Sequence, residues 1–277
     1  MTAAPMNEPL PSKIFDFDLD RLDLDAFAAN GFVAVDRVTT DEELEWLRGV
    51  YTQLLARPAS GFLDGVFDLS RPYGTLDAPM LGQLLMPERY IQAFTRTNMY
   101  RNSLAIAAHL LGMKASELEA WSHLIFKAPF SDAQTPWHQD EAYWDVHLRY
   151  RTVASWMPLD DVDVDNGCLW YVPGSQHNAV LSHRHAGGDP SVHVLEINET
   201  VDVSGAVPVP LPAGGMVFHH PRCLHHSGGN SLNTMRRAWG LAFQSTPVKR
   251  DKPVDHPWWY EGRQAHADGL AERKKST

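Results

Sequence analysis

The sequence has little cysteine, no long apolar run and no excess of positive charge. Its two cysteines, Cys168 and Cys223, cannot frame a secreted disulfide scaffold, so we expect reduced thiols. No stretch approaches the roughly 20 apolar residues of a membrane-spanning helix, and the first residues lack the positive start and apolar run of a signal peptide. The formal net charge of −10 disfavours nucleic acid and anionic membranes as partners, because both bind positive surfaces. We therefore expect a cytoplasmic protein that acts on a small molecule; the composition carries no signal for an oligomeric state.

Helical signals are confined to the first part of the chain, after a Pro- and Ala-containing start at 1–13 that we expect to be loose. Gly31 and Gly112 favour helix ends, because glycine adopts the left-handed conformation at low cost. Thr40 with Glu43 fits a capping box, in which each side chain binds a free amide at the helix start. The expected helices span 22–31, 41–56 and 99–111.

From about 119 onward, short runs rich in Val, Trp, Tyr and Phe alternate with Pro, Gly, Asn and Asp. This pattern is typical of a β-sandwich or barrel with helices packed outside it. No boundary is visible, so we expect one domain over 1–277, with a helical part at 14–118, a β core at 119–245 and a C-terminal extension at 246–277. The expected strands lie near 120–128, 136–139, 150–157, 168–172, 193–198, 207–211, 215–219 and 235–244.

The segment TPWHQDEAYW places His138 and Asp140 two residues apart. On a strand, such residues share a face, so an imidazole and a carboxylate can reach one point. Two histidines and one carboxylate form the facial triad of non-haem iron oxygenases, which leaves coordination positions open; a structural zinc site is closed by four protein ligands. Alone, this pair is more often a surface pair than a metal site. The second histidine would come from FHHPRCLHHSGGN, which offers His219, His220, His225 and His226.

The run MRRAWGLAFQ alternates between a bulky face and a face of small residues that includes Arg236. An arginine among small residues suits a pocket for a carboxylate, which a guanidinium binds with two parallel hydrogen bonds. A similar alternation in YRTVASWMPL puts Thr152 and Trp156 on one face. Trp156 would form a wall of that pocket, and Thr152 would be a polar contact in it. The alternatives to this pocket are that Arg236 is a surface residue and that Trp156 only fills the core.

Together these segments resemble the phytanoyl-CoA dioxygenase family of iron- and 2-oxoglutarate-dependent oxygenases. The resemblance covers about 120–245 and rests on TPWHQDEAYW, RTVASWMPLDDVDVDNGCLWYVPGSQH, PAGGMVFHHPRCLHHSGGNS and RRAWGLAFQ, in the family's order. It implies a mainly β fold with flanking helices, the double-stranded β-helix or cupin-like jelly roll. It also implies Fe(II), 2-oxoglutarate and O2 as cofactor and co-substrates. The implied reaction is oxidation, most simply hydroxylation, of a C–H bond in a small metabolite or natural-product intermediate, with release of succinate and CO2.

The resemblance also assigns roles to single residues. It makes His138, Asp140 and His225 the catalytic metal ligands, and we favour His225 over His226 because Ser227 and Arg236 then stand at the family's spacing. The implied 2-oxoglutarate contacts are Arg236, Ser227, Trp156 and Lys127.

Some assignments rest on position alone. Tyr143 and Trp144 follow the metal pair, so substrate contact and wall packing are both open for them. The stretch 61–74 is a candidate substrate-side loop, and PWWY at 257–260 is a packing plug in preference to a lid. Two other functions stay open. One is a cupin-like, metal-dependent isomerase or hydrolase without 2-oxoglutarate, in which Arg236 would have no carboxylate to bind. The other is a non-catalytic binding module.

Overall fold

Two antiparallel β-sheets face each other in the computed structural model, which describes residues 9–56, 66–72 and 78–275. Within these residues, the large sheet has the order β1 (Phe32–Val35), β12 (Met216–His219), β7 (Thr152–Pro158), β14 (Arg236–Ser245), β4 (Leu118–Lys127), β3 (Leu81–Leu85) and β2 (Phe67–Asp68). The small sheet has the order β11 (Val207–Val209), β8 (Leu169–Tyr171), β13 (His225–Ser227) and β5 (Thr135–His138). Two further pairs are β9 (His183–His185) with β10 (Leu195–Ile197), and β6 (Leu148–Arg149) with β15 (Val248–Lys249).

The two faces of the large sheet bury different kinds of side chain. Its outer face packs Trp239 and Phe243 of β14 against helices in the main hydrophobic core. Its inner face turns Trp156 and Ala238 towards Tyr171 of the small sheet, in a second cluster between the sheets. The predicted division of β14 into a bulky face and a small face is therefore confirmed, and the small face lines the interior. This is the predicted double-stranded β-helix with flanking helices.

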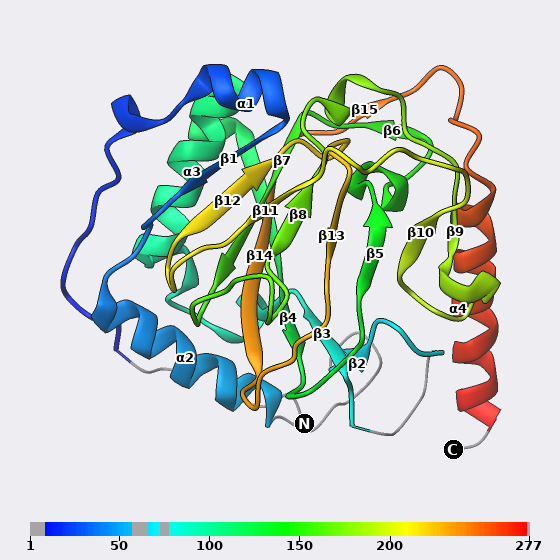
Figure 1. Ribbon diagram of the computed structural model, residues 1–277, viewed down its shortest axis with the longest axis horizontal. Coiled ribbons are helices and arrows are strands. Elements are labelled where there is room, and N and C mark those ends of the chain that lie inside the picture. Colours follow the sequence, from blue (N-terminus) through cyan, green and yellow to red (C-terminus); the bar gives the residue numbers. More distant parts are fainter. Residues whose placement is uncertain (1–8, 57–65, 73–77, 276–277) are drawn as a thin grey trace.

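Helices cover the outside of the sheets (Figure 1). In the described part of the chain, α1 (Leu24–Asn30), α2 (Asp41–Leu55) and α3 (Asn98–Leu111) lie towards the N-terminus, and α4 (Pro257–Lys275) follows the last strand. As predicted, α1 and α3 end at glycines in the left-handed conformation, Gly31 with φ +83° and Gly112 with φ +59°. Leu44, Leu47 and Leu54 of α2 are buried in the main core, which fixes the helix against the sheet.

The predicted capping box at the start of α2 is only half correct. The Thr40 hydroxyl accepts a hydrogen bond from the Glu43 amide at 3.1 Å, as expected of an N-cap. The Glu43 carboxylate does not return to Thr40; its oxygens accept hydrogen bonds from the amides of Asn98 at 2.7 Å and Met99 at 2.8 Å. A local motif was predicted because a residue 55 positions away cannot be recognised from spacing. Glu43 instead joins α2 to the first turn of α3.

Each of the eight expected strands has a counterpart in the structure. The sequence interpretation missed β2 and β3 in the part expected to be helical, the short strands β6, β9, β13 and β15, and α4. The run LGQLL of β3 has neither β-branched residues nor a polar alternation, which are the usual signals of a strand. Residues 1–8 of the expected loose start, and 61–65 and 73–74 of the candidate loop, lie outside the described residues.

The C-terminal segment packs against the body of the fold through Trp258. This side chain is buried, and its indole Nε1 donates a hydrogen bond to the Ala142 carbonyl at 2.9 Å. Trp258 therefore packs as a plug, as expected. Because Ala142 belongs to the turn that follows β5, we propose that 1–277 form one domain, as the sequence predicts.

Candidate active site

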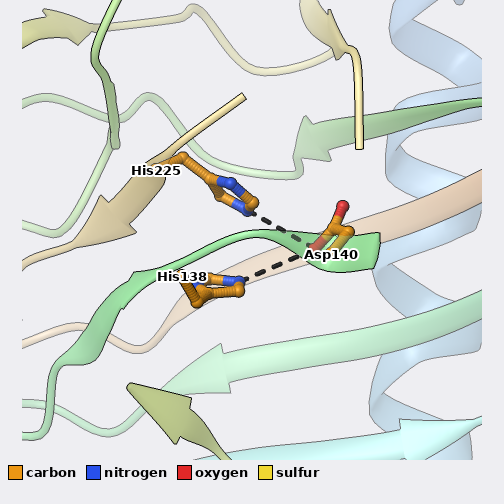
Figure 2. Close-up of side chains that lie close together, drawn as sticks. All are labelled: His138, Asp140 and His225. Atoms are coloured by element: carbon orange, nitrogen blue, oxygen red, sulfur yellow. Dashed lines mark ion pairs between the residues drawn. The ribbon is translucent and has the colours of Figure 1, made fainter. Parts of the chain in front are cut away.

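Three side chains from different elements converge at one end of the small sheet (Figure 2). His138 ends β5, His225 begins β13, and the two residues lie directly opposite each other in register. Asp140 begins the 3₁₀ turn Asp140–Tyr143. Its Oδ1 lies 3.6 Å from the Nε2 of His138 and 3.6 Å from the Nε2 of His225. The candidate ligand atoms all lie within 4.8 Å of one another, so one ion can contact all three.

Backbone carbonyls fix the orientation of both imidazoles. The Nδ1 of His138 lies 2.8 Å from the Pro136 carbonyl, and the Nδ1 of His225 lies 2.9 Å from the Cys223 carbonyl. A carbonyl oxygen can only accept, so each Nδ1 carries a proton, and each ring in its neutral form presents the lone pair of Nε2. Both lone pairs are thus available towards Asp140, which is how metal-binding histidines are usually held.

The charges at the site favour a metal ion. Burial opposes ionisation of Asp140, but His225, with His138 and His219, holds the pKa of this carboxyl well below its usual value. Burial, followed by His138, lowers the pKa of His225 well below its usual value. A carboxylate and neutral imidazoles are the protonation states that bind a divalent cation.

The second oxygen of Asp140 is held from outside this group. The Nε2 of His219 donates to Asp140 Oδ2 at 3.0 Å, and the His219 Nδ1 lies 2.9 Å from the Tyr171 hydroxyl. His219 ends β12, and Tyr171 ends β8 of the opposite sheet. The sequence offered His219 among four histidines, but it gave no signal for Tyr171. Together they orient the carboxylate so that Oδ1 faces the two imidazoles.

The neighbouring histidines point elsewhere. The His226 ring packs on Trp137 with centroids 4.2 Å apart, on the other side of β13 from His225. His220 accepts a hydrogen bond from the Arg222 amide at its Nδ1, at 3.1 Å. Among the described residues, the group that can hold a metal therefore contains two histidines and one carboxylate, without a fourth protein ligand. This is an open site, not a closed structural zinc site.

Arg236 lies on the inner face of β14 with its guanidinium 5.2 Å from the Trp156 ring centroid. It is 2% exposed, and its Nε and Nη1 find no hydrogen-bond partner among the described residues. Burial lowers its pKa to about 10, so it remains charged at neutral pH. An unpaired buried charge is strongly unfavourable, which indicates that an anion belongs here.

Lys127 places a second cation beside this arginine. It lies opposite Arg236 in the pairing of β4 with β14, and it is fully buried. Its Nζ donates to the Ala133 carbonyl at 2.7 Å. Burial, and after it Arg236, lowers the pKa of Lys127 well below its usual value. A dicarboxylate with one end at this pair would offset both effects, so the residues present fit 2-oxoglutarate.

The other expected 2-oxoglutarate contacts differ in position. Ser227 is buried two residues beyond His225 on β13, and its hydroxyl donates to the Gly167 carbonyl at 2.9 Å. Its lone pairs remain able to accept. Thr152 is paired with Gln244, eight residues along β14 from Arg236. At about 3.3 Å per residue this is roughly 26 Å, so Thr152 does not reach the carboxylate that Arg236 would bind.

The two residues expected on the substrate side are also separated. The Tyr143 ring meets the His138 ring edge to face with centroids 5.9 Å apart, and its hydroxyl accepts from the Leu195 amide at 2.8 Å. The Trp144 ring packs on Tyr150 with centroids 5.2 Å apart. Tyr143 thus stands beside the metal site, whereas Trp144 has the wall-packing position.

The fold and this site define a class: non-haem iron oxygenases in which a double-stranded β-helix carries two histidines, one carboxylate and a buried arginine for a 2-oxo acid. A family model described as phytanoyl-CoA dioxygenase (PhyH) matches residues 27–238, and the chain belongs to this family. The predicted family, its oxidoreductase class and its requirement for iron and 2-oxoglutarate are therefore confirmed.

Individual relatives agree with this assignment. EvdO2 from Micromonospora carbonacea var. aurantiaca, solved in complex with 2-oxoglutarate, is 35% identical with a TM-score of 0.77, and the match covers 89% of this chain and 98% of EvdO2. Phytanoyl-CoA dioxygenase domain-containing protein 1 from Bos taurus is 33% identical over 122 residues, 43% of this chain and 42% of the relative. The chain thus matches less than half the length of that curated relative. The carbocyclase SnoK from nogalamycin biosynthesis, at 20% identity and a TM-score of 0.64 over 88% of this chain and 98% of SnoK, shares the fold.

Among the described residues, no helix has the length and apolarity that crossing a bilayer requires. A cytoplasmic location stays a prediction.

Proposed function

We propose that this chain is an Fe(II)- and 2-oxoglutarate-dependent dioxygenase. It would oxidise, most simply hydroxylate, a C–H bond of a small metabolite or natural-product intermediate, with release of succinate and CO2. One observation carries the proposal: His138, Asp140 and His225 converge in the interior that also buries the unpartnered guanidinium of Arg236. A protein without a carboxylate ligand would gain nothing from burying this charge.

The residues of the chain have distinct tasks in this proposal. His138 and His225 present Nε2 to the iron, and Asp140 presents Oδ1 while His219 holds its other oxygen. Arg236 binds the distal carboxylate of 2-oxoglutarate with two parallel hydrogen bonds. Iron with 2-oxoglutarate and dioxygen supplies the oxidising power for the C–H bond.

Three further residues would support the co-substrate. Trp156 lies under the guanidinium and restricts its plane. Lys127 adds a second positive charge, and Ser227 offers a hydroxyl on the side of His225. Tyr143, beside His138, is the residue expected to contact the substrate.

A small substrate is favoured over an acyl-CoA. The phosphates of CoA would be bound by a basic surface, whereas this chain carries 24 Lys and Arg against 34 Asp and Glu. The cations that are buried among the described residues, Arg236 and Lys127, would both serve 2-oxoglutarate.

The test is succinate formation from 2-oxoglutarate, measured with and without Fe(II). We expect succinate only when both are present, and its rate should rise when candidate metabolites include the substrate. His138→Ala should abolish the reaction. Coupled activity retained at the wild-type rate by His138→Ala would overturn the ligand assignment.

An isomerase or hydrolase of the same fold would not need 2-oxoglutarate. Calorimetric titration of 2-oxoglutarate into the metal-loaded protein separates this alternative from the oxygenase. Saturable binding that Arg236→Gln abolishes supports the oxygenase, whereas no binding to the wild-type protein supports the alternative.

A further inference from the structure

Two elements outside the two main sheets hold the turn that carries Asp140. From α4, the Trp258 indole donates a hydrogen bond to the Ala142 carbonyl at 2.9 Å. From β10, the Leu195 amide donates to the Tyr143 hydroxyl at 2.8 Å. Ala142, Leu195 and Trp258 also form a hydrophobic cluster of their own. The position of the turn therefore depends on where α4 and the β9–β10 pair lie.

His185 joins these two elements. It ends β9, which lies beside α4 (Figure 1), and it is paired with Leu195 of β10. Its Nδ1 lies 2.7 Å from the Val192 carbonyl, and its Nε2 lies 3.0 Å from the Trp258 carbonyl. The side chain is buried, and an added Cβ at Gly262 would lie 2.6 Å from the ring, so α4 packs over the imidazole at this glycine. One side chain thus bridges the β9–β10 pair and α4.

Both ring nitrogens of His185 face atoms that can only accept. A carbonyl oxygen has no proton to give, so each of the two hydrogen bonds needs an N–H on the ring. A neutral imidazole has one N–H and would turn the lone pair of its other nitrogen towards the second carbonyl. A buried carbonyl that is left without a donor is unfavourable. The geometry therefore selects the doubly protonated ring.

His183, the other buried histidine of β9, shows the contrast. Its Nδ1 lies 2.8 Å from the Leu181 carbonyl, whereas its Nε2 accepts a hydrogen bond from the Gln139 amide at 3.2 Å. A neutral ring satisfies both contacts, and burial lowers the pKa of His183 to about 4. Gln139 lies between the two metal ligands of this segment. The strand β9 thus supports the metal-binding segment directly through His183, and through His185 by way of Trp258.

The groups around His185 are compatible with a charged ring. Hydrogen bonds from Ser191 lower the pKa of the exposed Asp189, and His185 lowers it further. Burial, and after it His185, lowers the pKa of His193 to about 4, so His193 is neutral, as His183 is. The other ionisable side chains nearby are the exposed Glu261 and Arg263 of α4, His266, which acts on His193, and Arg184 and Glu196, which pair with each other at 2.7 Å. Asp189 thus favours a positive ring.

We propose that His185 is a positioning residue whose doubly protonated ring joins α4 to the β9–β10 pair and so holds the turn that carries Asp140. The proposal rests on the proposed oxygenase function and adds to it a dependence on pH. Histidine is the side chain that ordinarily changes its charge between pH 5 and 8. The protonated ring binds both carbonyls, so the connection is complete at the acidic end of this range. Loss of the proton leaves one carbonyl without a donor, so the turn is held less firmly as the pH rises.

The first experiment reads the protonation of the ring in the metal-free protein. With ¹⁵N-labelled histidine, the NMR signals of His185 are identified by their absence from His185→Gln. At pH 6 we expect both ring nitrogens to carry protons that exchange slowly with water. The exposed His147, whose ring lies 6.0 Å from that of Trp259 on α4, is the control, because its ring protons should exchange rapidly.

The second experiment measures Fe(II) affinity by calorimetry under nitrogen at pH 6 and pH 8. It compares the wild-type protein with His185→Leu, His185→Gln and the control His147→Gln. The metal ligands are the same in every variant, so the ratio of wild-type to variant affinity cancels their own titration.

At pH 6, His185→Leu should weaken Fe(II) binding about tenfold, the lower end of the effect of losing a partner behind a ligand. At pH 8 the ratio should fall to about threefold, because the wild-type protein has then lost one hydrogen bond of its own. Glutamine can donate to the Trp258 carbonyl at either pH, so His185→Gln should bind about threefold more weakly than wild type at pH 6 and equally at pH 8. His147→Gln should match the wild-type protein at both values.

A ring that is neutral at pH 6, or ring protons that exchange as fast as those of His147, would overturn the proposal. So would affinity ratios that do not change between pH 6 and pH 8, because a residue that only fills space has no such dependence. If His185→Leu does not fold, the glutamine variant and the NMR measurement decide. Failure of the oxygenase function itself would look different: the wild-type protein would form no succinate from 2-oxoglutarate in air, while the protonation of the ring would still be as stated.

Discussion

His219 binds the oxygen of Asp140 that faces away from the two imidazoles of the site. Its Nε2 lies 3.0 Å from Asp140 Oδ2, whereas Asp140 Oδ1 lies 3.6 Å from the Nε2 of both His138 and His225. The Tyr171 hydroxyl bonds the other nitrogen of His219. The carboxylate therefore cannot rotate without breaking a hydrogen bond between the two sheets.

This relationship predicts that His219 controls metal affinity without touching the metal. His219→Leu should weaken Fe(II) binding by about 10- to 100-fold, the usual effect of losing a partner behind a ligand. Tyr171→Phe should also weaken Fe(II) binding, but by less, since it removes only the hydrogen bond to the Nδ1 of His219. Metal titration monitored by calorimetry measures both. Wild-type affinity in His219→Leu would show that Asp140 is held by other means.

The sequence predicted this site well where the chemistry is local. His138 and Asp140 share a face as the two-residue spacing requires, although Asp140 lies in a turn just beyond the strand. The link is Gln139, which is extended and turns its side chain away from the metal to the Arg222 carbonyl and the Leu181 amide. The choice among four histidines needed the resemblance, because the register of β13 on β5 is a property of the folded chain.

The features that the sequence did not predict depend on pairing between strands that are far apart in the chain. Gln83 and His123 share the inner face of the large sheet only because β3 pairs with β4, and the run that forms β3 has no strand signal. In the sequence, Gly240 is one of several small residues on its face of β14, and only the structure shows that the His123 ring covers it. Thr152 was placed on the correct face, but the length of β14 separates it from Arg236.

A second prediction concerns the register of the histidine pair on β13. His225→Ala should lose Fe(II) binding, whereas His226→Ala should retain it, because the His226 ring packs on Trp137 and faces away from Asp140. The two residues are adjacent, so each variant controls for the local effect of the other. Equal loss of metal in both variants, with both proteins folded by circular dichroism, would contradict the register.

A third prediction concerns the buried carboxylate that joins two helices. Glu43→Ala leaves the amides of Asn98 and Met99 without acceptors, so it should lower the free energy of unfolding by about 2–4 kcal/mol, as expected for lost hydrogen bonds to a charged group. The neighbouring Glu42→Ala is the control, because Glu42 is exposed on α2 and should have little effect. Urea denaturation measures both. Equal stability of the two variants would show that α3 does not depend on Glu43.

A fourth prediction follows from the unpartnered guanidinium of Arg236. Arg236→Met should raise the stability of the protein without 2-oxoglutarate by about 1–3 kcal/mol, because an unsatisfied buried polar group is removed. The same variant should lose the stabilisation by 2-oxoglutarate, which for the metal-loaded wild-type protein amounts to about 2.7 kcal/mol at one hundred times Kd. Stability would thus rise as function is lost.

The control for the Arg236→Met prediction is a variant of the next residue on β14. Arg237 faces outward and pairs with Asp160 through two hydrogen bonds, at 2.9 and 2.7 Å. Arg237→Met should therefore not raise stability, and its response to 2-oxoglutarate should be that of the wild-type protein. Thermal unfolding with and without 2-oxoglutarate compares the two variants. An Arg236→Met protein that 2-oxoglutarate still stabilises fully would remove this residue from the co-substrate site.

The last prediction is a proton uptake on binding of 2-oxoglutarate to the metal-loaded protein. Burial, and after it Arg236, lowers the pKa of Lys127 in the free protein, and a bound carboxylate raises it again. Affinity should therefore be constant below the free-protein pKa of Lys127. It should fall by up to about tenfold per pH unit between the free and bound pKa values, and become constant again above the bound value. Calorimetry in two buffers of different ionisation enthalpy measures the uptake, which should be absent in Lys127→Met. Proton release in place of uptake, or uptake that survives in Lys127→Met, would mean that another group carries the proton.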